Sequence, residues 1–325
     1  MNISSAMKLQ LGLPFGDGAA PESSSGADRR PHPIPYQGSK RHLADRILAL
    51  VQGRRFQRFV EPFAGSAAMT LAAAGSGVAN RFIIGESLEP LARIWQQVVE
   101  CPRSLADSYR DIWEAQFIDP VLHFTKVRAE FNKDRSPAKL LYLLARCVKN
   151  SPRFNPRGDF NQSADKRRHG MRPEKMEREL MGAARLLTGR TTVEVADYVQ
   201  TLASATAHDL VYLDPPWEGT STGRDKRYHQ GLRRERLLET LADLNRRQVP
   251  FLLSYDGRCG EKTYGDPLPD ALDLRHIELP AGRSSQATLN GRDDITVEAL
   301  YVSPWLTDHC VEAGYAATFS EQPLA

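Results

Sequence analysis

Residues 58–86, RFVEPFAGSAAMTLAAAGSGVANRFIIGE, decide the fold class of this chain. The segment opens with a short apolar run that ends at a Pro-containing turn. It continues as an Ala-rich stretch from about Ser66 to Ala74 and closes with a second apolar run, RFIIGE. We predict a strand, a turn, a helix and a second strand, which is the beginning of a β-α-β unit with parallel strands. Gly65 in the turn lets the backbone approach a ligand closely, and the N-terminus of the following helix favours negative charge.

The rest of the chain extends this pattern on both sides of a helical region. Apolar periodicity predicts helices over residues 42–51, 91–99, 105–117, 121–131 and 140–148. A long polar, basic loop follows and leads into a helix that ends near Leu187. After Thr191 we predict strands at 191–195, 209–214, 251–255, 274–279 and 295–301, with helices near 198–205 and 232–246. The expected fold is one α/β sheet with helices on both faces, built from both ends of the chain and interrupted by a helical, basic insertion.

These features divide the 325 residues into four parts. The length fits about two domains, or one large domain with an insertion. Residues 1–34 are rich in Gly, Ala, Ser and Pro and poor in large apolar side chains, so we expect a flexible arm there. We assign residues 35–100 and 191–310 to the sheet domain, 101–190 to the insertion and 311–325 to a C-terminal tail.

Composition excludes several classes of protein. Hydrophobic residues make up 41% and charged residues 26% of the chain, as in an ordinary globular protein with a sizeable core. No window approaches the roughly 18 uninterrupted apolar residues of a membrane span, and the first residues do not resemble a secretory signal. We therefore expect a cytoplasmic protein. The four cysteines form no CxxC pair and the eight histidines no HxxxH or HxH pair, so we expect no metal site.

Positive charge is concentrated in one part of the chain. Residues 146–190 hold 12 Lys and Arg against five Asp and Glu, whereas the whole chain carries a net charge of only +3. Lys and Arg on a loop suit nucleic-acid phosphates and guanine edges, and the candidates are Arg153, Arg157, Lys166, Arg167, Arg168 and Arg172. A second basic cluster comprises Arg224, Lys226, Arg227, Arg233, Arg234 and Arg236. A basic run on its own is also consistent with a solvated surface.

The strongest local signal for chemistry is LVYLDPPW, residues 210–217. This apolar strand carries Asp214, two prolines and Trp217 to its C-terminal end, the edge at which open α/β sheets bind ligands. The prolines stiffen the backbone and leave it only hydrogen-bond acceptors, and the indole offers a flat face for stacking. Such a site suits the exocyclic amino group of a planar base, with Asp214 and a backbone carbonyl as acceptors. Taken alone, the motif is equally consistent with an ordinary turn.

A second set of residues completes a cleft. Glu61, Gly65 and Ser66 lie at the first strand-to-helix turn, and Glu86 ends the next strand about 20 residues after Gly65. This is the spacing at which an acidic residue reaches ribose hydroxyls in nucleotide-binding α/β folds, although the pattern is not GxGxxG. Each residue alone is explained by a turn or a solvated strand end. Together with the DPPW strand they predict a site for a nucleotide-like cofactor.

From residue 36 to about residue 304 the chain resembles the Dam-type, N6-adenine-specific DNA methyltransferases. YQGSK (36–40) is similar to the family's N-terminal cofactor motif, EPFAGS (61–66) to its S-adenosylmethionine motif and DPPW (214–217) to its catalytic tetrapeptide. The order and spacing of these motifs also fit the family.

Further segments strengthen the resemblance. RAEFN (128–132) and RFNPRGDFN (153–161) resemble segments that flank the family's DNA-recognition region, and Asp197 with Tyr198 resembles the site that meets the cofactor's adenine. The chain has Trp217 where the family more often has Tyr or Phe, and Glu86 where it commonly has Asp. Both replacements keep the needed chemistry.

The resemblance implies a Rossmann-like methyltransferase sheet with an inserted target-recognition region. It also implies transfer of the methyl group of S-adenosylmethionine to adenine N6 in double-stranded DNA, after the base is flipped out, without a metal. The catalytic residues would be Asp214, Pro215, Pro216 and Trp217. The cofactor would meet Tyr36, Lys40, Glu61, Pro62, Phe63, Ala64, Gly65, Ser66, Glu86, Asp197 and Tyr198. The DNA would meet Arg153, Arg157, Lys166, Arg167, Arg168, Arg172, Arg227 and Tyr228.

Three alternatives stay open from the sequence. DPPW also occurs in some RNA adenine methyltransferases, so the acceptor can be RNA. Cytosine N4 is disfavoured because enzymes of that kind more often have Ser in place of Asp214. A catalytically silent nucleic-acid-binding module would keep the same fold.

The N-terminal arm holds one further motif. Residues 10–15, QLGLPF, resemble the short peptides that dock on bacterial sliding clamps. A chance match, or an arm that packs on its own domain, explains the same residues. Clamp binding is therefore kept as a hypothesis.

Overall fold

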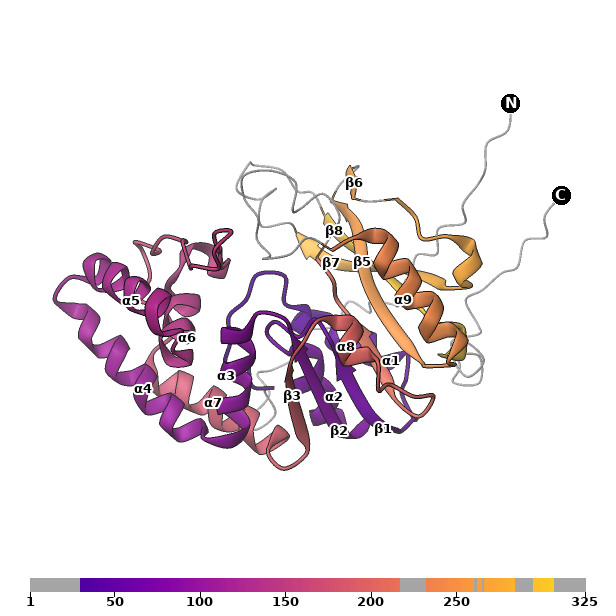
Figure 1. Ribbon diagram of the computed structural model, residues 1–325, viewed down its shortest axis with the longest axis horizontal. Coiled ribbons are helices and arrows are strands. Elements are labelled where there is room, and N and C mark those ends of the chain that lie inside the picture. The colour runs from indigo at the N-terminus through magenta and orange to yellow at the C-terminus, as the bar shows by residue number, and fades with distance from the viewer. Residues whose placement is uncertain (1–29, 217–231, 260–261, 265, 284–294, 307–325) are drawn as a thin grey trace, which may run out of the picture.

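The fold is built around one mixed β-sheet. The computed structural model describes residues 30–216, 232–259, 262–264, 266–283 and 295–306 (Figure 1). The described strands are β1 Phe56–Glu61, β2 Ala79–Glu86, β3 Thr191–Val195, β4 Leu210–Leu213, β5 Phe251–Cys259, β6 Lys262–Tyr264, β7 Arg275–Arg283 and β8 Ile295–Val302. They are ordered β3-β2-β1-β4-β5-β8-β7, and β6 pairs with β5. Strands β1 to β5 pair in parallel, whereas β6, β7 and β8 pair antiparallel.

The central strands are buried on both faces, which explains their apolar sequences. Along β4, Leu210 and Tyr212 belong to one hydrophobic cluster, whereas Val211 and Leu213 belong to another. Successive side chains of a strand point to opposite faces, so the two clusters are the two cores on either side of the sheet. A parallel strand covered on both faces reads as a continuous apolar run rather than an alternating one.

Helices cover both faces of this sheet. They are η1 Lys40–His42, α1 Ala44–Ala49, α2 Ala68–Ser76, α3 Glu89–Glu100, α4 Pro102–Glu114, η2 Ala115–Phe117, α5 Pro120–Asp134, α6 Pro137–Arg146, η3 Val148–Asn150, α7 Pro173–Leu187, α8 Tyr198–Leu202, α9 Arg234–Arg246 and η4 Asp270–Leu272. Helices α8 and α9 pack on one face, and α1, α2 and α3 on the other. Helices α4 to α7 gather beyond α3, at the opposite end of the molecule from α9 (Figure 1).

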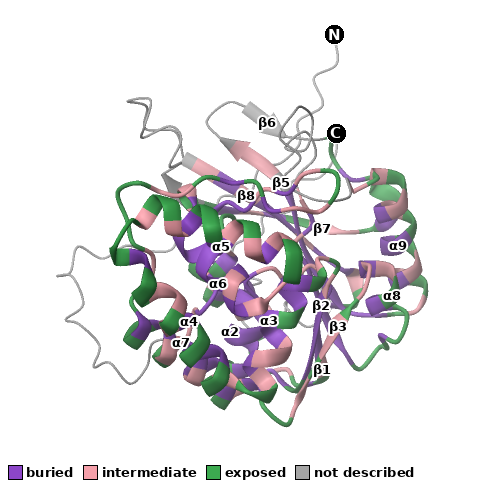
Figure 2. Cartoon of the chain, turned by 60° about the vertical axis from the view of Figure 1, so that its left-hand side comes forward, coloured by how far each residue is buried: buried purple, intermediate pink, exposed green. Residues whose placement is uncertain are grey.

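Local sequence explains where several of these helices begin. Helices α4, α5, α6 and α7 each start with a proline, whose fixed φ suits the first helical position and whose missing N–H has no helical partner there. At the start of α5, the side chain of Asp119 also accepts hydrogen bonds from Val121 N and Leu122 N. Figure 2 shows that the inner helix faces and much of the central strands are buried, whereas the outer faces of α4, α5 and α9 are exposed.

The polar loop after η3 is anchored to α5 and to itself. Asn132 on α5 accepts a hydrogen bond from Phe160 N at 2.8 Å and donates one to Phe160 O at 3.1 Å. The rings of Phe154 and Phe160 meet edge to face with centroids 5.5 Å apart. The two segments that were singled out in the sequence, 128–132 and 153–161, therefore touch each other in the fold.

The strands and helices predicted within the described ranges are present, with shifted bounds. The α/β architecture with helices on both faces is confirmed. Strand β6 was not predicted, because a segment of three residues, KTY, is too short to show a periodicity, and β5 extends past the predicted end at residue 255. The expected helix over 42–51 is two pieces, η1 and α1, separated by Leu43.

The folded structure also begins earlier than expected. The backbone of His32 donates a hydrogen bond to Glu179 on α7 at 2.6 Å, and Ile34 is completely buried in the core. The boundary of the arm at residue 34 is therefore wrong by several residues. Because the composition of residues 1–34 is poor in large apolar side chains on average, it gave no signal for the short segment that packs on α7.

The residues that the structure describes lack two classes of feature. None of their helices has both the length and the apolar character that crossing a membrane requires. These residues contain no group of three or more His, Cys, Asp and Glu side chains placed to hold a metal ion.

Candidate active site at the carboxyl edge of the sheet

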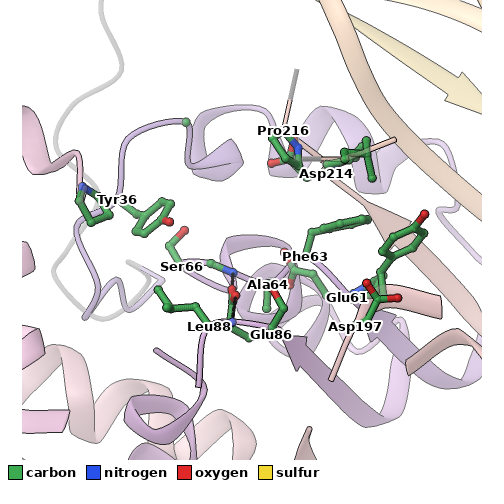
Figure 3. A pocket seen from close by; sticks show the side chains of 18 of the residues that line it. Tyr36, Glu61, Phe63, Ala64, Ser66, Glu86, Leu88, Asp197, Asp214 and Pro216 are labelled. Carbon is green, nitrogen blue, oxygen red and sulfur yellow. Dashed lines mark hydrogen bonds between the residues drawn. The ribbon is translucent and has the colours of Figure 1, made fainter. Parts of the chain in front are cut away.

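A cavity of about 1200 Å³ opens where the strand order changes direction. Strand β1 lies between β2 and β4, and the helices α2 and α9, which follow β1 and β4 along the chain, pack on opposite faces of the sheet. This crevice at the carboxyl ends of parallel strands is the usual ligand site of open α/β sheets. All eleven predicted cofactor residues line the cavity, together with Asp214, Pro215 and Pro216 (Figure 3). The insertion adds a further wall from Arg135, Ser151, Pro152, Phe154 and Gly158.

The turn after β1 is held against the end of β2 by one carboxylate. Glu86 accepts hydrogen bonds from Gly65 N at 3.1 Å and from Leu88 N at 2.9 Å, one on each carboxylate oxygen. Burial raises the pKa of Glu86, and these backbone N–H groups act in the opposite direction. Gly65 has φ +50°, a left-handed conformation in which glycine avoids the strain of a side chain. Glu86 therefore fixes the shape of the turn as well as lining the cavity.

Glu61 is directed toward helix α2. One of its carboxylate oxygens accepts hydrogen bonds from Thr70 N at 2.7 Å and Thr70 Oγ1 at 2.5 Å. Burial raises the pKa of Glu61 to about 8, against the opposing effect of these hydrogen bonds. The side chain is therefore largely protonated at neutral pH, and it joins the end of β1 to α2 at the floor of the cavity.

An aromatic group forms one end of the cavity. The rings of Phe63 and Tyr198 stack with centroids 4.8 Å apart, and the Arg236 guanidinium lies 5.4 Å from the centre of the Tyr198 ring. Arg236 also pairs with Asp197 at 2.8 Å, while the Asp197 side chain accepts a hydrogen bond from Val199 N and so caps α8. Arg236 was grouped with a basic cluster in the sequence. The structure brings it instead to the two residues that were assigned to the cofactor's adenine.

Asp214 lies just beyond β4 and is engaged by a lysine. Lys40 Nζ is 2.8 Å from Asp214 Oδ1 and 3.7 Å from Glu298 Oε2 on β8. Burial raises the pKa of Asp214, and the Lys40 ammonium acts to lower it. Burial also raises the pKa of Glu298 to about 7. At the end of the cavity that Asp214 lines, a lysine therefore lies between two carboxylates.

Sequence reasoning missed Glu298. The strand ITVEALYV, residues 295–302, carries one carboxylate on the same face as Leu300 and Val302, which belong to the core. A lone charge on a buried strand face is costly without a partner, so this pattern was a usable signal. The partner, Lys40, is far away in the sequence and was assigned to the cofactor.

A family model described as D12 class N6 adenine-specific DNA methyltransferase matches residues 36–278. This chain belongs to that family. A curated relative, the retron Ec67 DNA adenine methylase of Escherichia coli, is 26% identical over 185 residues. That alignment covers 53% of this chain and 61% of the relative. Family membership accounts for the motif order along the chain and for the α/β sheet.

Six of the eight predicted DNA-binding residues of this family member lie on the loop of the insertion. Arg157, Lys166, Arg167, Arg168 and Arg172 are exposed, and Arg153 is half-buried. Arg168 pairs with Asp165 at 2.7 Å. Four predicted elements of the site, Trp217, Arg227, Tyr228 and residues 10–15, lie outside the described residues.

Proposed function

We propose that this protein transfers the methyl group of S-adenosylmethionine to the N6 atom of adenine in double-stranded DNA. The observation that carries the proposal is the shared cavity. Asp214 and the two prolines after β4 line the same space as the Gly65 turn and Glu86. A family that methylates adenine N6 in DNA needs a cofactor pocket beside an acceptor for the target amino group, and both fit within this cavity.

The residues present fit the cofactor. A cavity of about 1200 Å³ exceeds the roughly 300–1,000 Å³ of an ordinary small-molecule site, so it has room for a nucleoside cofactor and a base together. Each oxygen of Glu86 accepts one backbone N–H bond, which leaves lone pairs for ribose hydroxyls. The Phe63 ring offers an aromatic face, and Asp197 lies beside it. Bound here, S-adenosylmethionine supplies a methyl group already activated on a sulfonium.

Asp214 is assigned to the target base. Its carboxylate accepts a hydrogen bond from N6, and the Pro215 and Pro216 segment contributes carbonyl acceptors without competing N–H donors. These acceptors orient the amino group and draw its lone pair out of conjugation with the ring. A base inside a duplex cannot reach the cavity, so the target adenine is flipped out at a cost of a few kcal/mol.

The DNA side is assigned to the insertion, residues 101–190. Its exposed Arg and Lys side chains lie on the loop whose residues Ser151, Pro152 and Phe154 line the cavity. Phosphates held by this loop would therefore belong to nucleotides close to the flipped base. We also propose residues 10–15 as a docking peptide for a sliding clamp. A peptide of residues 8–16 without saturable binding to a clamp would refute this second proposal.

The deciding experiment identifies the methylated base. The protein is incubated with isotopically labelled S-adenosylmethionine and unmethylated genomic DNA, and the DNA is digested to nucleosides. Label in N6-methyladenine supports the proposal, whereas label in N4-methylcytosine, or in RNA alone, contradicts the assigned acceptor. DNA binding without any cofactor binding would point to a catalytically silent module.

Two variants test the role of Asp214. Asp214→Ala is expected to abolish transfer and to leave cofactor binding intact, because the carboxylate is assigned to the acceptor amine. Asp107→Ala removes an exposed carboxylate from α4 and is the matched control, with unchanged transfer. Retained turnover in Asp214→Ala would remove Asp214 from the chemistry.

A further inference from the structure

The ammonium of Lys40 lies between the carboxylates of Asp214 and Glu298 in the cavity. Lys40 Nζ donates a hydrogen bond to Asp214 Oδ1 at 2.8 Å and lies 3.7 Å from Glu298 Oε2. The Lys40 side chain is only 8% exposed and that of Glu298 only 12%. Glu298 Oε2 is buried and accepts no hydrogen bond from any residue that the structure describes. A buried acceptor without a donor is costly, and the nearest charge that can satisfy it is the Lys40 ammonium.

The contact between Lys40 and Asp214 conflicts with methyl transfer. Positive charge develops on N6 as that nitrogen takes the methyl group, and an ammonium on the same carboxylate repels that charge. The ammonium also weakens Asp214 as an acceptor for the amino group, because it already shares the carboxylate's charge. Asp214 therefore acts best when Lys40 has moved away from it.

We propose that Glu298 is a positioning residue that receives the Lys40 ammonium when the target adenine engages Asp214. We call this movement of the Lys40 ammonium from Asp214 to Glu298 the handover, and it rests on the proposed function. Moving Nζ from 3.7 Å to a charge-assisted hydrogen-bond distance from Glu298 Oε2 requires a shift of about 1 Å, well within the reach of the flexible lysine stem. The lysine stays paired throughout, so no uncompensated charge is left in the buried site.

The handover makes methylation depend on pH in a defined direction. Burial raises the pKa of Glu298 to about 7, an effect that Lys40 opposes and Asp214 reinforces. Glu298 is therefore an anion that can receive Lys40 above about pH 7, and a neutral acid that leaves Lys40 on Asp214 below it. The methylation rate is expected to fall as the pH drops through about 7.

Other titratable groups near Glu298, Asp214 among them, are unchanged in a Glu298 variant, so substitution separates their titration from that of Glu298. Glu61 on β1 and Tyr212 on β4 lie in the same buried network; burial raises the pKa of Glu61 to about 8 and that of Tyr212 well above its ordinary value. In the flanking strands, Arg258 on β5 and Glu278 on β7 pair with each other at 3.2 Å. Directly opposite Glu298 these strands carry Gly257 and Leu279, which do not titrate.

The test measures single-turnover adenine methylation from about pH 5.5 to about pH 8.5. Glu298→Gln keeps the shape of the side chain but cannot become an anion. We expect it to lower the methylation rate about tenfold above pH 7 and to leave cofactor affinity unchanged. We also expect it to abolish the fall in rate as the pH drops through about 7, which we call the acid limb. Glu298→Asp retains a carboxylate and is expected to keep the limb. Glu278→Gln is the matched control in the same sheet, with unchanged rate and limb.

The outcomes separate the handover from the proposed function. If Glu298→Gln keeps the acid limb, the handover is refuted. If Glu298→Gln fails to fold, Lys40→Met decides instead, because loss of the limb in that variant supports the handover and a retained limb refutes it. Methylation of adenine by the unaltered protein without any limb near pH 7 refutes the handover alone. No methylation of adenine at any pH refutes the proposed function itself.

Discussion

Replacing Gly85 by alanine should both destabilise the protein and distort the cofactor end of the cavity. Gly85 lies on β2 just before Glu86, where α8 and the turn after β1 come close to the strand. A Cβ at this position would lie 2.6 Å from Thr201 Oγ1, 2.8 Å from Thr201 Cγ2 and 3.0 Å from Pro62 Cα. Distances this short are not tolerated, so either α8 or the backbone at Pro62 must move.

The expected cost is about 3 kcal/mol, the upper end of the range for overpacking a core. Thr201 is β-branched and so has few alternative rotamers, and the third contact is with backbone. Gly75→Ala provides a matched control, because Gly75 is an exposed residue of α2 whose nearest neighbour would be the Arg30 side chain at 4.0 Å. That substitution should stabilise the protein by about 0.5 kcal/mol by restricting the unfolded chain.

Urea unfolding measures the free energy of unfolding of both glycine variants, and isothermal titration calorimetry measures their affinity for the cofactor. Gly85→Ala should weaken cofactor binding, because α8 carries Tyr198 at the aromatic end of the cavity, and Gly75→Ala should not. Adding Thr201→Ala to Gly85→Ala removes two of the three short contacts and should recover part of the stability. A Gly85→Ala protein within about 0.5 kcal/mol of the parent would refute this packing argument.

Three further predictions concern single side chains. Phe63→Ala removes the ring that stacks on Tyr198 and should weaken cofactor binding about tenfold in the same titration. Asp209→Ala should cost about 2 kcal/mol in urea unfolding at neutral pH, since it leaves Arg58, 26% exposed, without its fully buried partner. Burial raises the Asp209 pKa, but its hydrogen bonds lower it overall, so this difference should vanish as acid protonates Asp209. Arg167→Ala should reduce the salt slope of DNA binding by about one.

The sheet could be predicted from sequence because its strands are covered on both faces. LVYL and FLLSY read as continuous apolar runs, and the residues that follow such runs in a parallel sheet lie at its carboxyl edge. The Gly65 turn, Glu86 and Asp214 were therefore predictable as neighbours. β6 carries no such pattern and was missed.

Pairings between distant residues could not be predicted in the same way. Glu298 meets Lys40 because β8 joins the sheet antiparallel beside β5, and local periodicity does not determine the order of strands. Arg236 reaches Asp197 because α8 and α9 share one face of the sheet. From the sequence, Arg236 was grouped with the basic residues near it, although its partner Asp197 lies at the start of another helix.

The insertion and the sheet share one hydrophobic core. Tyr109 on α4, Phe131 on α5 and Leu180 on α7 belong to the same buried cluster as Phe59 and Phe82 of the sheet. The helices that precede and follow the basic loop therefore cannot be exchanged as a cassette without rebuilding the layer that supports β1 and β2. Under the proposed role of the loop between residues 151 and 172 in DNA binding, attempts to change target sequence by grafting from relatives should exchange only its exposed residues and keep Phe154 and Phe160, which belong to the same cluster. Both ends of that loop are joined to helices that would remain in place.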